Sequence, residues 1–595
     1  MVDRIKTYDI GGSSLQVYMG IGLLGVVLLL TQRLSAQEEI DVHSSASIVT
    51  EQMMTVTDRH LYVSGEIVWF KAHCMDRISG MLSNYSKVAN VELVSAHGIA
   101  VLRVKIELNQ GLGTGNLELP RDLPSGLYTI RSYTQAMRNF GEDGFDENHV
   151  VVLNPDFPIQ KSNNDESELN DRSSGIASEG MDIIVKVSQN VVNQRSRVDV
   201  DITTLDATGE PISASIAISA SLGLETDIFK PEDLNSSSNQ DQRSFELPQS
   251  LTLKYHPEFE GIHINGEVVD PTNDQGIENA LVFLSFPGRV PHVYAQRTNS
   301  AGYFNFSLPK MYGLKPIVVQ AQIDSAQRFR IKMEDGFEPI TPSDPQAFSL
   351  DEKWWPLADA MLENAQIRRA YEAFAETPQY VKDDPFSLIP FYGAPYSHYK
   401  LDDYTRFPLP EFFYEVVRKV RVTGKFGNER LKMINDWEPL SGQAPPLLLV
   451  DGVPVFDQTT FLKINNKLIE STDIVVKPFW LNPVIFDGII SMNSIDHDAR
   501  SFTLPETAVR ESFLGLQPRR LFQSPDYSLA ADETLPDFRN TLYWNPVIKS
   551  DENGKVSIHF YTSDAVGHYD IKVVGVTDRG IGHSKASIEV VQGLK

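Results

Sequence analysis

The chain has 595 residues, a formal net charge of −26 and a single cysteine, and each of these values excludes a class of function. The excess of 79 Asp and Glu over 53 Lys and Arg argues against binding to nucleic acid or to anionic lipid. One cysteine excludes an intramolecular disulfide, a paired-cysteine redox motif and a multi-cysteine zinc site. A chain of this length predicts about three to five domains.

The N-terminus has the pattern of a secretory signal peptide. Arg4 and Lys6 precede an apolar run at 17–30, which is shorter than the ~20 residues that span a bilayer as a helix. We therefore predict that residues 1–36 are a signal peptide, cleaved after Ala36, and that the protein is exported. An uncleaved membrane anchor is the alternative.

Residues 46–155 predict a β-sandwich. Four segments, separated by turn residues, largely alternate apolar and polar side chains. The glycine-rich stretch 110–115 lies between two of these segments and opens no helix, so it predicts a loop between strands and not a dinucleotide-binding loop. The four segments are 67–72, 88–94, 100–108 and 126–133.

Two motifs of this region resemble alpha-2-macroglobulin-type domains. Residues 57–72 read TDRHLYVSGEIVWFKA and resemble the opening of such a domain, with His60 and Ser64 where prolines are usual. Residues 123–130 read LPSGLYTI and resemble its closing strand. The resemblance implies a macroglobulin-like sandwich.

The next 185 residues or so predict two further sandwiches separated by polar linkers. Residues 181–233 resemble a second macroglobulin-like set of strands. Residues 259–340, with a hairpin turn at Gly302, resemble the carboxypeptidase regulatory-like domain, a small sandwich without catalytic activity. The linkers are predicted at 156–180 and 234–258. After them, the segment 341–380 shows a helical period over 357–374.

Residues 381–494 carry the most specific resemblance. Strand patterns at 444–456, 469–476 and 486–492 resemble the plug domain of TonB-dependent outer-membrane receptors of the Bacteroidetes type, in which a carboxypeptidase regulatory-like domain also comes first. Such a receptor closes a 22-stranded barrel, which needs ~220 residues. About 100 residues follow Ser494, so we expect a plug-like domain without the barrel.

The C-terminal part predicts a linker at 495–535 and a β unit at 536–595. In that unit a hairpin turn at 551–555 separates alternating strands, and the unit resembles the macroglobulin segment that precedes the thioester domain. The predicted fold class is therefore mainly β: a multidomain chain of β-sandwiches with a small α+β plug-like domain.

No residue set predicts a catalytic, cofactor or metal site. The thioester of macroglobulins needs a Cys-Gly-Glu-Gln run, whereas Cys74 is followed by Met75. In a strand, Cys74 is expected to be a small buried apolar residue. His73 beside it is too isolated to hold a metal, and metalloprotease, hydrolase and nucleotide-binding motifs are missing.

Ten aromatic residues lie between Phe386 and Tyr414. Core packing is the first interpretation, because exposed aromatic patches of this size are rare; a partner-binding surface is the alternative. An Asp-Gly turn is predicted further along, at Asp451 and Gly452. In the first interpretation this turn merely closes a hairpin. The partner-binding residues predicted by the alternative are Tyr392, Tyr396, Tyr399, Tyr404, Asp451, Gly452, Val453 and Pro454.

The sequence thus predicts a non-enzymatic exported envelope protein that acts as a binding or scaffold component. The expected partner is an envelope protein, such as an outer-membrane receptor or transporter of a TonB-dependent system, and not nucleic acid. We expect it in the periplasm, at the outer membrane or on the cell surface, peripheral to the membrane. The alternative is a macroglobulin-like endopeptidase inhibitor or peptide-binding protein that lacks the thioester.

Overall fold

The computed structural model describes residues 50–158, 180–223, 253–324, 327–342, 350, 354–371, 377–381, 389–404, 407–425, 427–434, 444–528, 535–577 and 580–593. The predicted signal peptide, most of the two linkers 156–180 and 234–258, and Phe386 lie outside these residues. The described chain is mainly β, as the sequence predicts. Among its helices, none has the length and apolar content needed to cross a bilayer.

The first sandwich contains eight strands, hydrogen-bonded in the order β1-β3-β6-β5-β4-β7-β8-β2. Its core collects apolar side chains from both halves of this order. The strands are β1 (Glu51–Thr57), β2 (Leu61–Val63), β3 (Ile67–Asp76), β4 (Val88–Ser95), β5 (Ala100–Asn109), β6 (Leu112–Glu118), β7 (Gly126–Tyr133) and β8 (Asp146–Leu153). Two short 3₁₀ helices, η1 (Ala136–Phe140) and η2 (Glu142–Gly144), precede β8.

Strand β3 is buried on both faces. Val68, Phe70 and Cys74 point into the core of the first sandwich, as the two-residue period of a strand requires. Between them, Trp69 and Lys71 are buried on the opposite face. This burial explains why the strand reads as a long, mostly apolar run.

The glycine-rich stretch 110–115 is a turn and a strand, not a loop between strands. Gln110 and Gly111 form the turn with positive φ values of 50° and 77°, and β6 begins at Leu112. Gly115 lies inside β6. Glycine is favoured at this position because a Cβ there would be 2.5 Å from the Phe70 ring. Close packing of an aromatic ring on the backbone is a reason for glycine in a strand.

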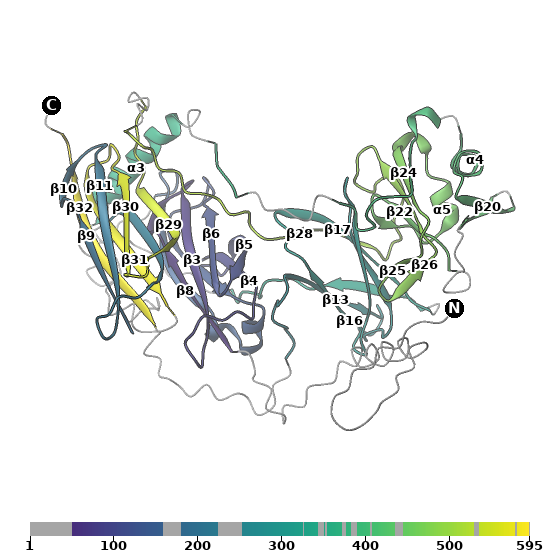
Figure 1. Ribbon diagram of the computed structural model, residues 1–595, viewed down its shortest axis with the longest axis horizontal. Helices are drawn as coiled ribbons and strands as arrows, with labels where there is room; N and C mark the ends of the chain where they lie inside the picture. The colour runs from purple at the N-terminus through teal and green to yellow at the C-terminus, as the bar shows by residue number, and fades with distance from the viewer. Residues whose placement is uncertain are drawn as a thin grey trace, which may run out of the picture. The chain divides into compact units, whose positions relative to one another are not determined.

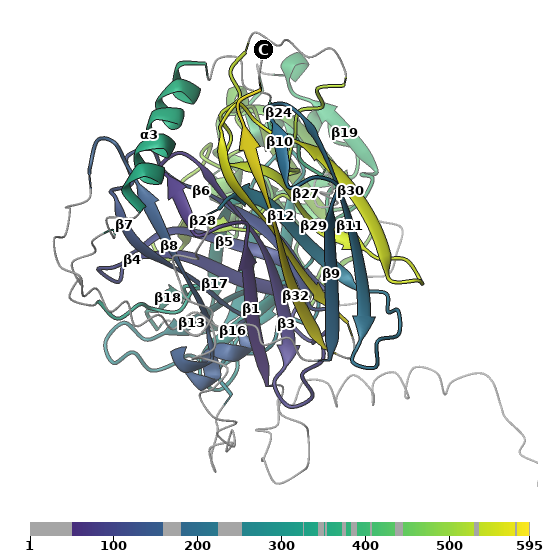
Figure 2. The same ribbon diagram turned by 90° about the vertical axis from the view of Figure 1, so that its left-hand side faces the viewer.

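The second sandwich is assembled from two distant parts of the sequence. Strands β9 (Met181–Val187), β10 (Val191–Asn193), β11 (Arg197–Asp206) and β12 (Ser215–Leu222) pair with β29 (Thr541–Lys549), β30 (Lys555–Tyr561), β31 (Gly567–Val576) and β32 (Ile581–Val591). The sheets have the orders β10-β32-β31-β12-β29 and β30-β11-β9. In Figures 1 and 2 the blue strands β9 and β11 lie beside the yellow strands of the C-terminus.

This pairing corrects the division of 181–233 and 536–595 into two units. Both parts supply one shared core, so neither holds a complete sandwich. A fragment 37–340, which the sequence alone would suggest as a set of complete sandwiches, leaves out half of the strands of the second one.

The third sandwich also takes a strand from a segment predicted to be a linker. Its sheets have the orders β16-β13-β18 and β15-β14-β17-β28, and β28 (Val509–Leu514) comes from the predicted linker 495–535. The hairpin predicted at Gly302 does not form: the turn there, with a φ of 77° at the glycine, connects β15 to β16, which lie in different sheets. The other strands are β13 (Ile262–Val269), β14 (Leu281–Phe286), β15 (His292–Arg297), β16 (Tyr303–Leu308), β17 (Leu314–Gln322) and β18 (Arg330–Met333).

Helix α3 (Trp355–Ala370) packs on the outside of the first sandwich. Ala358, Met361 and Ala365, spaced three and four residues apart, face Leu61 and Val151 of β2 and β8. The helix starts two residues before the predicted range 357–374 and ends at Ala370.

The plug-like unit is a five-stranded sheet with helices on one face. The sheet order is β19-β24-β27-β22-β23, and β22 pairs with β27 in parallel. The elements are β19 (Ser397–Lys400), η6 (Asp402–Tyr404), α4 (Leu409–Glu415), β20 (Val420–Lys425), β21 (Asn428–Met433), β22 (Leu447–Val450), β23 (Val453–Pro454), α5 (Gln458–Leu462), η7 (Asn466–Leu468), β24 (Ile469–Val475), β25 (Phe479–Leu481), β26 (Val484–Phe486) and β27 (Ile489–Ser494).

Strand β22 is apolar throughout because both faces of the sheet are covered. Leu448 and Val450 belong to the core beneath α4 and α5. Leu447 and Leu449 point to the opposite side, where they pack with Phe283 of the third sandwich.

Candidate functional site

Most of the predicted aromatic surface is core. The Tyr392 hydroxyl donates to Asp473 Oδ2 at 2.8 Å, and the tyrosine is buried. Burial and the Asp473 carboxylate raise the pKa of Tyr392. Tyr399 and Tyr404 are partly buried against Phe412, with ring centroids 6.2 and 5.7 Å away.

Tyr396 is the exposed member of the four predicted tyrosines. Its side chain is 61 % exposed, and the Lys419 ammonium lies 5.7 Å from its ring centroid. Two further aromatic residues of the unit are exposed, Tyr414 by 72 % and Trp480 by 69 %. The sequence did not single out Trp480, because its hairpin β25–β26 has no distinctive motif.

The predicted Asp-Gly turn closes a hairpin, as the first interpretation states. Asp451 and Gly452 have φ values of 50° and 82° between β22 and β23. Asp451 is fully buried, and its carboxylate accepts hydrogen bonds from the backbone N–H and hydroxyl of Ser494 and from the N–H of Ala499. The turn thereby fastens β22 to the chain that follows β27.

The same turn contacts the third sandwich of its own chain. A Cβ on Gly452 would lie 2.4 Å from Pro291 Cβ, and Gln320 Nε2 donates to Pro454 O at 2.9 Å. Val453 packs with Val318. These four residues are therefore buried within the chain and offer no surface to another protein.

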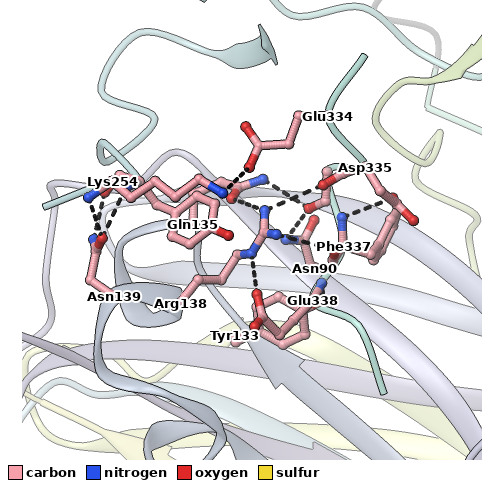
Figure 3. Close-up of polar contacts among 12 residues, drawn as sticks. Asn90, Tyr133, Gln135, Arg138, Asn139, Lys254, Glu334, Asp335, Phe337 and Glu338 are labelled. Carbon is pink, nitrogen blue, oxygen red and sulfur yellow. Dashed lines mark hydrogen bonds and ion pairs between the residues drawn. The ribbon is translucent and has the colours of Figure 1, made fainter. Parts of the chain in front are cut away.

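Side chains of the first sandwich bind a short, bent segment of the chain (Figure 3). We call the site that these side chains form the groove. Residues 335–338, which follow β18, lie across β4, β7 and η1. Asn90 Nδ2 and Gln135 Nε2 donate to Gly336 O at 3.2 and 2.8 Å. Arg131 Nη2 donates to Glu338 O at 2.9 Å, and Glu338 N donates to Tyr133 Oη at 2.8 Å.

Basic side chains bind the rest of the segment. Arg138 Nε donates to Glu338 Oε2 at 2.7 Å and Arg138 Nη2 to Phe337 O at 3.3 Å. The Phe337 ring is 5 % exposed, and the Arg103 and Lys105 cations lie 5.0 and 5.6 Å from its centroid. Burial lowers the pKa of Lys105. The groove therefore binds both the main chain and the side chains of an acidic, phenylalanine-containing segment.

Another polar cluster joins the first sandwich, α3 and the second sandwich. Glu66 Oε2 accepts from Arg59 and Glu66 Oε1 accepts from Arg368, each at 2.6 Å. Burial would raise the pKa of Glu66, but the two guanidinium groups outweigh burial and lower it to about 2. A cavity of 310 Å³ beside this cluster is lined by Arg369 and Arg539. These guanidinium groups donate to Ser64 and to the Tyr561 carbonyl, so their role is to hold the chain together.

Within the described ranges, no group of three His, Cys, Asp or Glu side chains is arranged to hold a metal ion. Cys74 is completely buried, and burial, reinforced by the Glu51 carboxylate, raises the pKa of its thiol. A protonated, inaccessible thiol is a poor nucleophile.

The sequence carried one signal for the groove that motif searches miss. The pentapeptide Glu-Asp-Gly-Phe followed by an acidic residue occurs at 142–146 and again at 334–338. A self-comparison of the chain would have found this repeat.

No protein-family model matches this sequence. No curated protein matches it either. Solved structures that resemble the chain include Escherichia coli alpha-2-macroglobulin in its native conformation, at 9 % identity and a TM-score of 0.24, over 91 % of this chain and 40 % of that one. Salmonella alpha-2-macroglobulin reacted with methylamine gives 11 % identity and a TM-score of 0.22, over 91 % and 40 %. The Escherichia coli adhesin FdeC gives 10 % and 0.14, over 48 % and 64 %. The chain thus spans about two fifths of the length of these macroglobulins.

Proposed function

We propose that the chain is a non-enzymatic, exported envelope protein that binds another protein through its plug-like unit, residues 389–494. The partner is an outer-membrane protein of a TonB-dependent transport system. The proposal extends the resemblance of 381–494 to receptor plugs, and the acidic charge of the chain fits a protein partner better than an anionic membrane.

One observation carries this proposal: the plug-like unit exposes three large aromatic side chains at separate places on its surface. Tyr396, Tyr414 and Trp480 are each more than 60 % exposed. Trp and Tyr are the residues that most often dominate the energy of a protein interface. Leu447 and Leu449 of the sheet pack on the third sandwich, so these two residues are not available to a partner.

The test is site-specific photo-crosslinking in intact cell envelopes. A photoreactive phenylalanine analogue replaces Trp480, and the matched control carries it in place of Ile78, which is 78 % exposed on the first sandwich. We expect an adduct with an outer-membrane receptor at position 480 and none at position 78. Equal labelling at both positions, or no adduct at 480, would remove the support for this partner surface.

Export is tested separately by N-terminal sequencing of the protein from cell envelopes. We expect the mature chain to start after Ala36, because Ala36 ends the signal-like pattern and is followed by an acidic stretch. Recovery of the intact segment 1–36 would favour the anchored alternative.

A second candidate function is a macroglobulin-like endopeptidase inhibitor or peptide-binding protein without a thioester. The observation that favours it is the groove of the first sandwich, which holds residues 335–338 largely by their main chain. An endopeptidase assay with a protein substrate and a small chromogenic substrate tests inhibition. Loss of cleavage of the large substrate alone would support this candidate.

A further inference from the structure

Both copies of the repeated pentapeptide contact Arg131 and Tyr133 of the first sandwich. In the copy at 142–146, Arg131 Nη1 donates to Glu142 Oε1 at 3.1 Å. The Phe145 ring stacks on Tyr133 with centroids 4.1 Å apart. In the copy at 334–338, the same Arg131 and Tyr133 bond to the main chain of Glu338. Two segments of the same sequence thus use the same pair of side chains.

Side chains of the groove contact Asp335, Gly336 and Phe337 of the second copy individually. The Arg103 guanidinium bonds to Asp335 Oδ2 at 3.2 Å. A Cβ on Gly336 would lie 2.7 Å from Lys105 Nζ, so a larger residue there would require the end of the lysine side chain to shift. Phe337 fills the space between the Arg103 and Lys105 cations, an arrangement that attracts an aromatic ring.

The groove continues beyond the segment that occupies it. A cavity of 510 Å³ begins at Ile340 and Arg103 and follows the chain from Gly98 to Val101 at the start of β5. Among the described residues, β6 pairs with β5 only at Leu108 and Asn109, and a single bridge joins Lys105 to Leu516. Nothing in the described chain pairs with residues 100–104 on the side of β5 away from β4. An unpaired strand edge beside an open cavity is a site where an extended segment can add.

We propose that this groove is a recognition site for an acidic-Gly-Phe-acidic segment of a partner protein, and that residues 335–338 occupy it as an intramolecular stand-in. The partner segment displaces 335–338 and continues with an apolar residue into the cavity beside Ile340. The ion pairs of Arg103 with Asp335 and of Arg138 with Glu338 show charge complementarity to an acidic segment and support this occupant. The inference does not rest on the contact proposed for residues 389–494; it deepens the second candidate function, a peptide-binding protein, which uses the same groove.

A partner segment can bind the groove only if it competes successfully with residues 335–338, which already occupy it. A covalently linked segment has an effective concentration of about 1 mM or more, and a partner must compete with it. The wild-type chain should therefore bind a short peptide at least about 10-fold more weakly than a chain whose own segment cannot enter the groove.

The experiment uses the full mature chain with Phe337→Ser and Glu338→Ser, which removes the anchor ring and the carboxylate. The probe is a fluorescent peptide with the sequence of residues 331–342, and binding is measured by anisotropy. The control peptide has serine in place of phenylalanine. On the protein, Arg138→Ala is added to the double variant, and Arg197→Ala, an exposed arginine of the second sandwich that pairs with Asp199, is the matched control.

We expect saturable binding to the double variant with a Kd of about 10–100 µM. Binding should be lost with the control peptide and with Arg138→Ala, but kept with Arg197→Ala. A folded double variant that does not bind the peptide at about 1 mM would overturn the proposal. If the double variant does not fold, hydrogen exchange on the wild-type chain decides. Faster exchange of the Glu338 amide with excess peptide supports displacement, and unchanged exchange contradicts it.

Discussion

The Asp451 carboxylate accepts hydrogen bonds from both the backbone N–H and the hydroxyl of Ser494, each at 2.6 Å. Asp451 stands at the tip of the β22–β23 hairpin, and Ser494 is the last residue of β27. The strands β22 and β27 are parallel, and the pair therefore joins their carboxyl ends. Both side chains are buried, so neither bond can be replaced by bulk water.

From this pair we predict that Asp451→Ala destabilises the plug-like unit by about 3 kcal/mol or more. The substitution leaves Ser494 and the Ala499 N–H without an acceptor and places alanine at a positive φ. Asp451→Asn is the control, because asparagine tolerates this φ and retains one acceptor; we expect a loss of about 1–2 kcal/mol. Urea unfolding measures both, and equal losses would contradict this account.

Gly452→Ala is predicted to weaken the contact between the plug-like unit and the third sandwich. The added Cβ would lie 2.4 Å from Pro291 Cβ at a φ of 82°. Gly427→Ala is a matched control, because Gly427 also has a φ of 82° but has no atom within 4 Å of its Cβ position. Hydrogen exchange of the β14 and β22 amides should rise in the first variant only. The same rise in both variants would assign the effect to backbone strain.

The stability of the chain should fall as the pH rises from about 4.5 to about 7 because of Glu258. Burial raises the pKa of Glu258 to about 7, although the cations of Lys105 and Arg138 lower it and Glu51 adds to the rise. In this range the folded chain keeps a proton that the unfolded chain loses, so the contribution of Glu258 falls by up to about 3 kcal/mol. Above about pH 7 the contribution of Glu258 to the free energy of unfolding no longer changes with pH.

Glu258→Gln is expected to remove this pH dependence. Urea unfolding at about pH 5 and about pH 7.5 measures the effect in both chains. The difference in free energy of unfolding between the two pH values should be smaller in the variant. An identical difference would show that other groups cause it.

Lys71→Met is predicted to stabilise the chain at neutral and low pH. Burial lowers the pKa of Lys71 to about 7, and its Nζ donates to Ser215 Oγ at 3.0 Å. Between about pH 7 and 10.5 the unfolded chain binds the proton that the folded chain has lost, so wild-type stability rises with pH. The gain from methionine, about 2 kcal/mol below pH 7, should shrink toward pH 10. Thermal unfolding across this range measures it; a gain that does not change with pH would contradict the cause.

Cys74 is predicted to be inert in the folded chain. Its side chain is buried and its thiol stays protonated, so a maleimide should label it only after unfolding. Cys74→Ala should cost about 1 kcal/mol and leave partner binding unchanged. Fast labelling of the native chain, or loss of binding at an unchanged melting temperature, would contradict this prediction.

The sequence by itself determined where most strands lie and which face of each is apolar. Segments such as 126–133 and 181–187 alternate clearly, and the structure has strands with these bounds. The Asp-Gly pair at 451–452 predicted a hairpin because few residues tolerate two positive φ values in succession. These features depend on neighbouring residues, so they can be read from the chain locally.

Only the tertiary structure decided which strands share a core and which surface stays free. β12 pairs with β29 and β31, which come more than 300 residues later, and no local pattern encodes such a partner. For the same reason the predicted contact residues Gly452 and Pro454 proved to be buried against Pro291 and Gln320. The sequence does not distinguish an apolar or aromatic residue that packs inside its own chain from one that contacts another protein. The packing of distant segments makes the difference.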